Sequence, residues 1–209
     1  MAQIQIESNQ APFDRPQTAL RAARVLIRAD AMGLLDDLDI RHLDESSFDQ
    51  ALKRIAGAGI GKGFRAAWAA RRKQNLSSEE LDGFLIQLAE DLEMSAVPEH
   101  EWPALDGVLG ISLLAKLVDV SPVSVRRYRT QARPTPDAVA SRLHFVASLV
   151  GDLAGAYNAF GTRRWFERPR AALDGRTPAA LLSGDWSPED PGACKVRDLA
   201  RSLSASPAT

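Results

Sequence analysis

Cysteine and long hydrophobic runs are scarce in this sequence, and each shortage excludes a class of protein. The 209 residues include one cysteine, which excludes a disulfide framework and a multi-cysteine metal site and indicates a reducing compartment. No apolar run reaches the roughly 18 residues that a membrane-spanning helix needs. Residues 1–16 lack the basic start and apolar stretch of a secretory signal. We therefore expect a soluble, cytoplasmic protein with no membrane partner.

The residue types that usually carry catalysis form no active-site pattern. The three histidines lie far apart and none has the spacing of metal ligands; they are His42, His100 and His144. His144 has apolar neighbours, so we interpret it as a core or interface histidine. Cys194 has no catalytic signature around it, and no G-x-S-x-G sequence supports a serine nucleophile. The sequence thus predicts a binding protein rather than an enzyme, without a metal or a cofactor.

The glycine-rich stretch Gly57–Gly63 invites comparison with a phosphate-binding loop. Such a loop follows a buried strand and needs serine or threonine directly after its lysine. Here Gly63 follows Lys62, and the preceding segment has a helical pattern. We interpret the stretch as a turn between two helices.

Composition and charge indicate a folded chain with two electrically different halves. Hydrophobic residues make up 45% and charged residues 25%, which is typical of a globular protein with a packed core. Residues 1–104 contain 12 basic and 17 acidic residues, a net charge of -5, which leaves 14 basic and 10 acidic residues, +4, for residues 105–209. This asymmetry suggests two units with different partners.

Apolar residues recur at helical spacing through most of the chain, and convincing strand alternation is hard to find. The sequence therefore predicts an all-α protein. The expected helices cover residues 16–35, 44–56, 64–73, 77–92, 109–118, 121–131, 136–160 and 163–166, a short stretch after Thr177–Pro178, and 193–203. Ser77 and Glu80 form a predicted capping box. The segment Ser95–Pro103 contains two prolines and is expected to be a linker.

These helices group into three expected parts. Residues 1–100 form a helical module of unknown role, residues 105–160 a helix-turn-helix followed by a long helix, and residues 161–203 a further helical subdomain. The apolar stripe of the long helix, residues 136–160, is broad for a surface helix. We therefore expect this helix to form the contact of a homodimer.

The segment Leu113–Pro134 has the pattern of a helix-turn-helix. Such a motif needs a small residue in its first helix, a tight turn, and an apolar row on its second helix. Ala115 is the small residue, and Asp119 occupies the turn position where glycine is usual. Ser121 caps the second helix and Pro122 stands in its first turn. The predicted buried row consists of Val118, Val120, Val125 and Tyr128.

This arrangement predicts a DNA-binding surface at the start of the second helix. Val123, Ser124 and Arg127 would face the base edges, and Arg127 and Ser124 would read them. Basic residues around them would hold phosphates, because no acidic residue lies between Ser121 and Gln131. The complete predicted set is Ser121, Val123, Ser124, Arg126, Arg127, Arg129 and Arg133.

A second pattern follows between Trp165 and Leu203. A tryptophan precedes the sequence L-x-G-R-T-P-x-x-L-L, which runs from Leu173 to Leu182. With the preceding helix-turn-helix, this order and spacing resemble the Xre/MbcA/ParS-type antitoxins, over about Leu109–Leu203. Further residues that carry the resemblance are Pro169, Gly192, Val196 and Leu199. Residues 186–191 are an insertion relative to that pattern, and residues 1–100 match nothing in it.

The resemblance implies a small helical protein that dimerises, binds double-stranded operator DNA and occludes the active site of an NAD-degrading RES-domain toxin. Carried over residue by residue, it implies that the toxin-facing side chains are Trp165, Arg176, Lys195, Arg197 and Arg201. Two alternatives to this antitoxin function stay open. One is a stand-alone helix-turn-helix transcription regulator without a toxin, and the other is a protein-interaction adaptor that has lost DNA binding.

Overall fold

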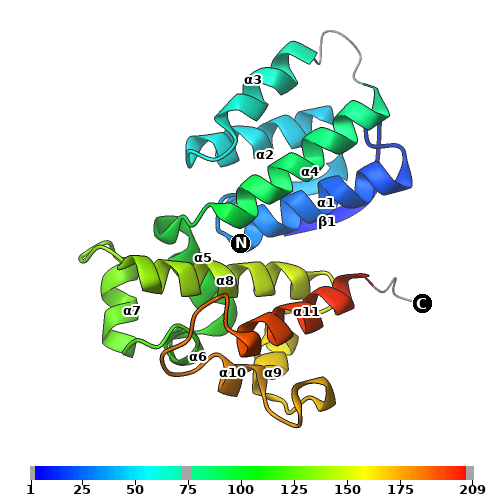
Figure 1. The fold of residues 1–209 in the computed structure, drawn as a ribbon. Coiled ribbons are helices and arrows are strands. Elements are labelled where there is room, and N and C mark those ends of the chain that lie inside the picture. The colour runs from blue at the N-terminus through cyan, green and yellow to red at the C-terminus, as the bar shows by residue number, and fades with distance from the viewer. Residues whose placement is uncertain (1–2, 72–76, 206–209) are drawn as a thin grey trace. The chain divides into compact units, whose positions relative to one another are not determined.

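The computed structural model describes residues 3–71 and 77–205 and shows a mostly helical chain (Figure 1). The chain divides into two compact units, Met1–Ser95 and Ala96–Thr209. We call them the N-terminal unit and the C-terminal unit. In the part of the chain that the model describes, no helix is both long enough and apolar enough to cross a membrane. The same residues contain no cluster of His, Cys, Asp and Glu that could hold a metal ion.

The N-terminal unit contains a pair of parallel strands, which corrects the prediction that strands are absent. The strands are β1 (Gln3–Asn9) and β2 (Asp39–Leu43), and helix α1 (Pro16–Ala31) connects them. Ile4 pairs with Ile40 in the ladder, and Ile40 and Leu43 are buried. The chain is nevertheless helical in class, because the described sheet has only these two strands.

The other helices of this unit are α2 (Glu45–Gly57), α3 (Lys62–Arg71) and α4 (Ser78–Met94). The predicted capping box of α4 is confirmed, since Glu80 N–H donates to Ser77 Oγ over 3.3 Å and Ser77 N–H donates to Glu80 Oε2 over 3.1 Å. The glycine-rich stretch is a helix–helix turn, as predicted. Gly59 and Gly61 have positive φ there, a backbone conformation that glycine adopts without strain.

Aromatic rings fill the core of the N-terminal unit. The Phe13 ring lies 5.0 Å from the Phe48 ring and 6.2 Å from the Trp68 ring, measured between centroids. Phe48 meets Trp68 edge-on at 5.2 Å. These three side chains are buried and come from the segment before α1, from α2 and from α3. Their contacts hold α3 onto the rest of the unit.

The described residues of the C-terminal unit, 96–205, form eight helical segments. They are α5 (Pro98–Leu109), α6 (Ile111–Leu117), α7 (Pro122–Arg129), α8 (Asp137–Ala154), α9 (Ala159–Glu167), the 3₁₀ helix η2 (Ala171–Leu173), α10 (Pro178–Leu181) and α11 (Pro191–Ala205). The linker predicted at Ser95–Pro103 is confirmed only for Ser95–Val97, where the two units divide, because α5 begins at Pro98. Pro98 starts this helix, where its missing N–H costs nothing.

The long helix predicted over residues 136–160 is shorter in the structure. It ends at Ala154, and Asn158 begins α9 by accepting a hydrogen bond from Gly161 N–H over 2.9 Å. The apolar stripe of α8 packs against α5, α9 and α11, and residues 142–151 are buried. Our prediction that this stripe forms a dimer contact is therefore wrong, because the stripe belongs to the core.

A buried polar pair joins α5 to α8. Glu101 is fully buried, and its Oε1 lies 2.6 Å from Nδ1 of His144, which is also buried. Burial raises the pKa of the Glu101 carboxyl, and the hydrogen bond with His144 opposes that shift. His144 is thus a core histidine with a defined partner, which confirms one of the two interpretations open from the sequence.

Candidate nucleic-acid interface and C-terminal helices

Helices α6 and α7 are joined by a tight turn, and local hydrogen bonds fix its shape. Val120 N–H donates to the Ala115 carbonyl over 3.0 Å, and Asp119 has a φ of +55°, the left-handed conformation expected for it. Ser121 is the N-cap of α7 and accepts a hydrogen bond from Ser124 N–H over 3.1 Å. The predicted cap and turn are therefore confirmed.

Buried residues fix α7 to its neighbours. Val125 and Tyr128 are buried, as are Ala115 and Val118 on the side of α6, whereas Val120 is half-buried. The Tyr128 ring stacks on the Trp102 ring of α5, with centroids 5.4 Å apart and planes at 22°. Contacts with both α5 and α6 leave the opposite face of α7 open to solvent.

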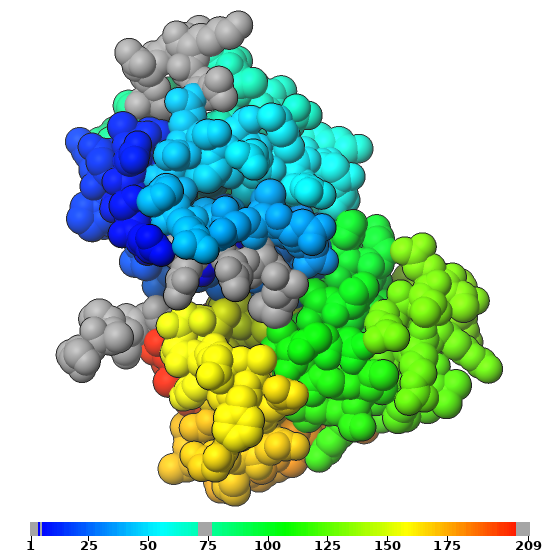
Figure 2. Space-filling model, turned by 180° about the vertical axis from the view of Figure 1, so that it is seen from behind, coloured from blue at the N-terminus to red at the C-terminus, as the bar shows by residue number. Residues whose placement is uncertain are grey.

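That open face presents the residues predicted to meet DNA. The Val123 side chain is 52% exposed, although it is apolar. Arg126 and Arg127 are exposed, and neither forms an ion pair with a residue that the structure describes. Ser124 is half-buried, and its Oγ lies 3.0 Å from the Ser121 Oγ. Figures 1 and 2 show α7 at one edge of the C-terminal unit.

The other two predicted phosphate-binding arginines have partners inside the protein. Arg129 forms an ion pair with Asp106 of α5, so part of its charge is compensated. Arg133 is exposed, and its guanidinium lies 6.0 Å from the centroid of the Tyr128 ring. Of the predicted basic set, Arg126 and Arg127 are therefore the side chains whose charge is most available to a ligand.

Trp165 does not lie on the surface, contrary to the prediction that it faces a toxin. Its side chain is 1% exposed, and its ring meets the Phe166 ring edge-on at 5.2 Å. The Arg170 guanidinium covers the Trp165 ring at 5.6 Å. Trp165 is a core residue of the C-terminal unit, where α9 packs against α5, α8 and α10.

The remaining residues of the predicted toxin-facing set lie at or near the surface. Arg176 is exposed and donates to the Ala180 carbonyl over 3.4 Å. Lys195 is exposed and pairs with Asp174 at 3.2 Å. Arg197 and Arg201 are half-buried on α11. Arg197 covers the Phe145 ring at 5.9 Å, and Arg201 lies 3.8 Å from a carboxylate oxygen of Asp152. Within the predicted toxin-facing set, Arg176 and Lys195 are therefore the exposed side chains.

The segment that the sequence analysis took as an insertion anchors the C-terminal helices to the α6–α7 turn. Trp186 is buried, and its Nε1–H donates to the Leu117 carbonyl over 2.9 Å. Arg142 of α8 donates to the Trp186 carbonyl over 2.6 Å and pairs with Asp185 at 2.5 Å. Asp119, in the turn, lies 3.9 Å from the same guanidinium. A tryptophan within a polar, proline-containing stretch was the available sequence signal.

Comparison with known proteins gave no match to any protein-family model, curated protein or solved structure.

Proposed function

We propose that this protein binds double-stranded operator DNA through the N-terminal end of α7. The observation that carries this proposal is an exposed helix face with Val123, Arg126 and Arg127, on a helix whose opposite face is buried against α5 and α6. A helix-turn-helix motif places such a second helix in the major groove, with its first residues at the base edges. No acidic residue on α7 opposes a phosphate backbone.

The proposal assigns separate roles to the polar and basic side chains of the motif. Arg127 and Ser124 read bases, since a guanidinium fork binds guanine and a hydroxyl both donates and accepts. Arg126 and Arg133 bind phosphates. Arg129 contributes less than these two, because Asp106 already pairs with it. A homodimer is part of the proposal, because one such helix covers only half of an operator site. The contact between the two protomers does not involve the apolar stripe of α8, which belongs to the core.

The test is a gel shift of the full chain with the DNA upstream of its own coding sequence, at physiological salt and with excess non-specific DNA. Arg127→Ala is expected to weaken specific binding by about 1–3 kcal/mol, and Arg126→Ala is expected to reduce the salt dependence by about one counterion. Arg163→Ala is the matched control, since it removes an exposed arginine from α9 instead. Equal operator binding by wild type and Arg127→Ala would show that Arg127 does not read bases.

We also propose that the protein is an antitoxin, which neutralises a RES-type toxin and represses its own operon. Its support is the resemblance described above together with two exposed basic side chains, Arg176 and Lys195. Co-expression with a RES-domain toxin is expected to preserve cellular NAD. The double variant Arg176→Glu/Lys195→Glu is expected to lose this protection while it retains DNA binding. Equal NAD depletion with and without the wild-type protein would exclude the toxin as a partner.

The two experiments also separate the competing functions. Specific operator binding without NAD protection identifies a stand-alone regulator. DNA binding that is indifferent to sequence and falls steeply with salt, as non-specific binding does, identifies a protein-interaction adaptor.

A further inference from the structure

The N-terminal unit contains a pocket that the DNA-binding proposal does not use. It lies between α3 and α4 and has a volume of about 290 Å³. Ligand pockets typically enclose about 300–1,000 Å³, so this one fits a small ring system. Its described lining consists of Phe64, Ala67, Trp68, Glu80, Gly83, Phe84 and Gln87.

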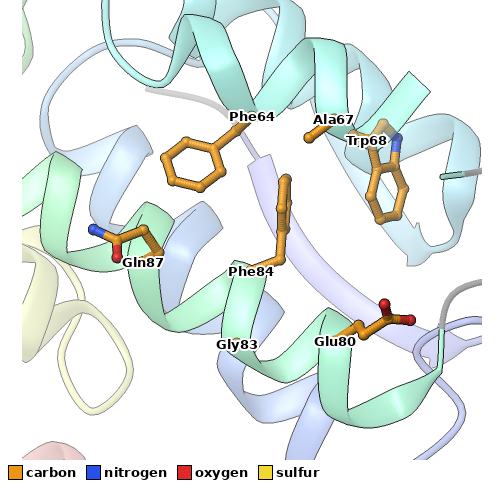
Figure 3. Close-up of a pocket in the computed structure, with 7 residues that line it drawn as sticks. All are labelled: Phe64, Ala67, Trp68, Glu80, Gly83, Phe84 and Gln87. Carbon is orange, nitrogen blue, oxygen red and sulfur yellow. The ribbon is translucent and has the colours of Figure 1, made fainter. Parts of the chain in front are cut away.

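Aromatic rings form the apolar part of this pocket. Figure 3 shows the Phe84 ring of α4 between the Phe64 and Trp68 rings of α3. Phe84 meets Phe64 edge-on at 5.1 Å, and its centroid lies 5.7 Å from that of Trp68. Phe64 and Phe84 remain half-exposed, whereas Trp68 is buried. The exposed parts of the Phe64 and Phe84 side chains can therefore contact a planar apolar group.

Gly83 contributes to this pocket through its missing side chain. It lies in the interior of α4, where glycine destabilises a helix relative to alanine. Packing does not require a glycine here, because a Cβ built on Gly83 meets no atom within 4 Å and its φ is not positive. The absence of a side chain at this position keeps the space beside Phe84 open.

The charge of the pocket lining favours a cationic ligand. Glu80 is the only ionisable side chain in the described lining. It is exposed, and its carboxylate also accepts hydrogen bonds from the backbone N–H and the Oγ of Ser77, over 3.1 and 3.0 Å. Aromatic faces carry negative potential and attract cations, and a nearby carboxylate adds to that attraction. We propose that this pocket binds a small aromatic cation, whose ring packs against Phe64 and Phe84 and whose positive charge lies near Glu80. This proposal is independent of DNA binding.

The experiment uses three bicyclic probes of nearly equal size with the full chain: N-methylquinolinium, naphthalene and 2-naphthoate. Titration is followed by two-dimensional ¹H–¹⁵N NMR, with attention to the amides of α3 and α4. The cation is expected to bind about tenfold more tightly than the anion, the factor that a cation over aromatic rings gains. Absence of saturable shifts in α3 and α4 with every probe would overturn the site. Equal affinity for all three would overturn the charge preference.

Two variants test the named residues. Glu80→Gln removes the charge but preserves the capping box, because glutamine serves equally at this position. It is expected to weaken binding of the cation by about threefold, the size of one exposed charge interaction, without changing that of naphthalene. Gly83→Leu is expected to fill the space and abolish binding. Its control is Gly107→Leu, since Gly107 is also exposed and helical with no atom near its built Cβ. Unchanged binding by Gly83→Leu would overturn the proposed location.

Discussion

Both units of this chain pack aromatic rings in their cores, but they differ in the polar groups that lie among those rings. In the N-terminal unit, the rings of Phe13, Phe48 and Trp68 make the central contacts, and the ion pair between Arg21 and Asp82 lies at its partly exposed edge. In the C-terminal unit, polar groups cross the core, and the buried Glu101–His144 pair is the clearest example.

This difference bears on function. The burial of apolar rings is less sensitive to geometry than hydrogen bonding, whereas buried hydrogen bonds are directional and costly to leave unmade. The C-terminal unit carries the surface proposed to read DNA, where helix positions must be fixed. Trp186 and Arg142 tie its last helices to the turn before α7. The comparison therefore predicts that single polar substitutions cost more in the C-terminal unit than in the N-terminal unit.

The largest expected effect is that of His144→Leu. It removes the partner of a buried carboxyl and is expected to cost about 3–5 kcal/mol of unfolding free energy near neutral pH. Because burial raises the pKa of Glu101, protonated Glu101 is tolerated better in the core. The cost should therefore shrink as the pH falls below that raised pKa and grow as the pH rises through it. Denaturant unfolding at pH 4.5 and pH 8 measures the difference.

The double variant Glu101→Leu/His144→Leu is the control for this experiment. It removes both polar groups, so it is expected to cost less than His144→Leu alone at pH 8. Equal losses in the single and double variants would show that the isolated carboxyl is not the cause.

The next effect is that of Trp186→Phe. The substitution preserves a ring beside Phe145 but leaves the Leu117 carbonyl without its buried donor, at an expected cost of about 1–3 kcal/mol. Trp102→Phe serves as the comparison. This substitution leaves the Thr135 hydroxyl without the hydrogen bond from Trp102 Nε1–H, but that hydroxyl is only part-buried and can bind water instead. Unfolding free energies are measured for both. A loss below about 1 kcal/mol for Trp186→Phe would contradict the anchoring role of Trp186.

A smaller effect is expected in the N-terminal unit from Asp44→Ala. Asp44 caps α2 by accepting from Ser47 N–H over 2.8 Å, and losing such a cap costs about 1 kcal/mol. The same backbone hydrogen bond lowers the pKa of Asp44. The contribution of Asp44 is therefore present above its unfolded pKa, about 3.9, and is lost as the pH falls through the lowered folded value.

Thermal unfolding of wild type and Asp44→Ala between pH 2 and pH 7 measures the contribution of Asp44 to stability. Asp44→Asn is the control, because asparagine preserves the cap without a titrating carboxyl. A stability gap between wild type and Asp44→Ala that stays constant down to pH 2 would contradict the assignment.

The smallest effect is expected from Arg21→Gln. Its ion pair with Asp82 is part-exposed, and such pairs contribute about 0–1 kcal/mol. Partial burial acts to raise the pKa of Asp82, but hydrogen bonds from Arg21 and Thr18 outweigh it and lower the pKa. Unfolding is compared at low and high salt, where screening should reduce the difference. A loss of more than about 2 kcal/mol of unfolding free energy would exceed what an exposed ion pair contributes. It would contradict the prediction that polar substitutions cost less in the N-terminal unit.

Much of the local structure was predictable because its causes lie within a few residues along the chain. The capping box at Ser77, the cap at Ser121 and the left-handed Asp119 each depend on neighbours no more than four positions away. The exposed face of α7 followed from the same local pattern. The alternating Ile4 and Ile6 were a signal for β1, but a strand needs a partner, and β2 lies more than thirty residues later.

The local residue pattern is enough to specify the mostly helical class, the caps and turns, and the basic face at Arg126 and Arg127. Which apolar and charged groups are available to a partner depends instead on contacts between distant parts of the chain. The tertiary structure buried Trp165 and the α8 stripe, paired Arg129 with Asp106, and left a pocket beside Phe84. The physical reason is that burial and pairing depend on residues from distant elements, whereas helix periodicity shows only that a face is apolar, not what covers it.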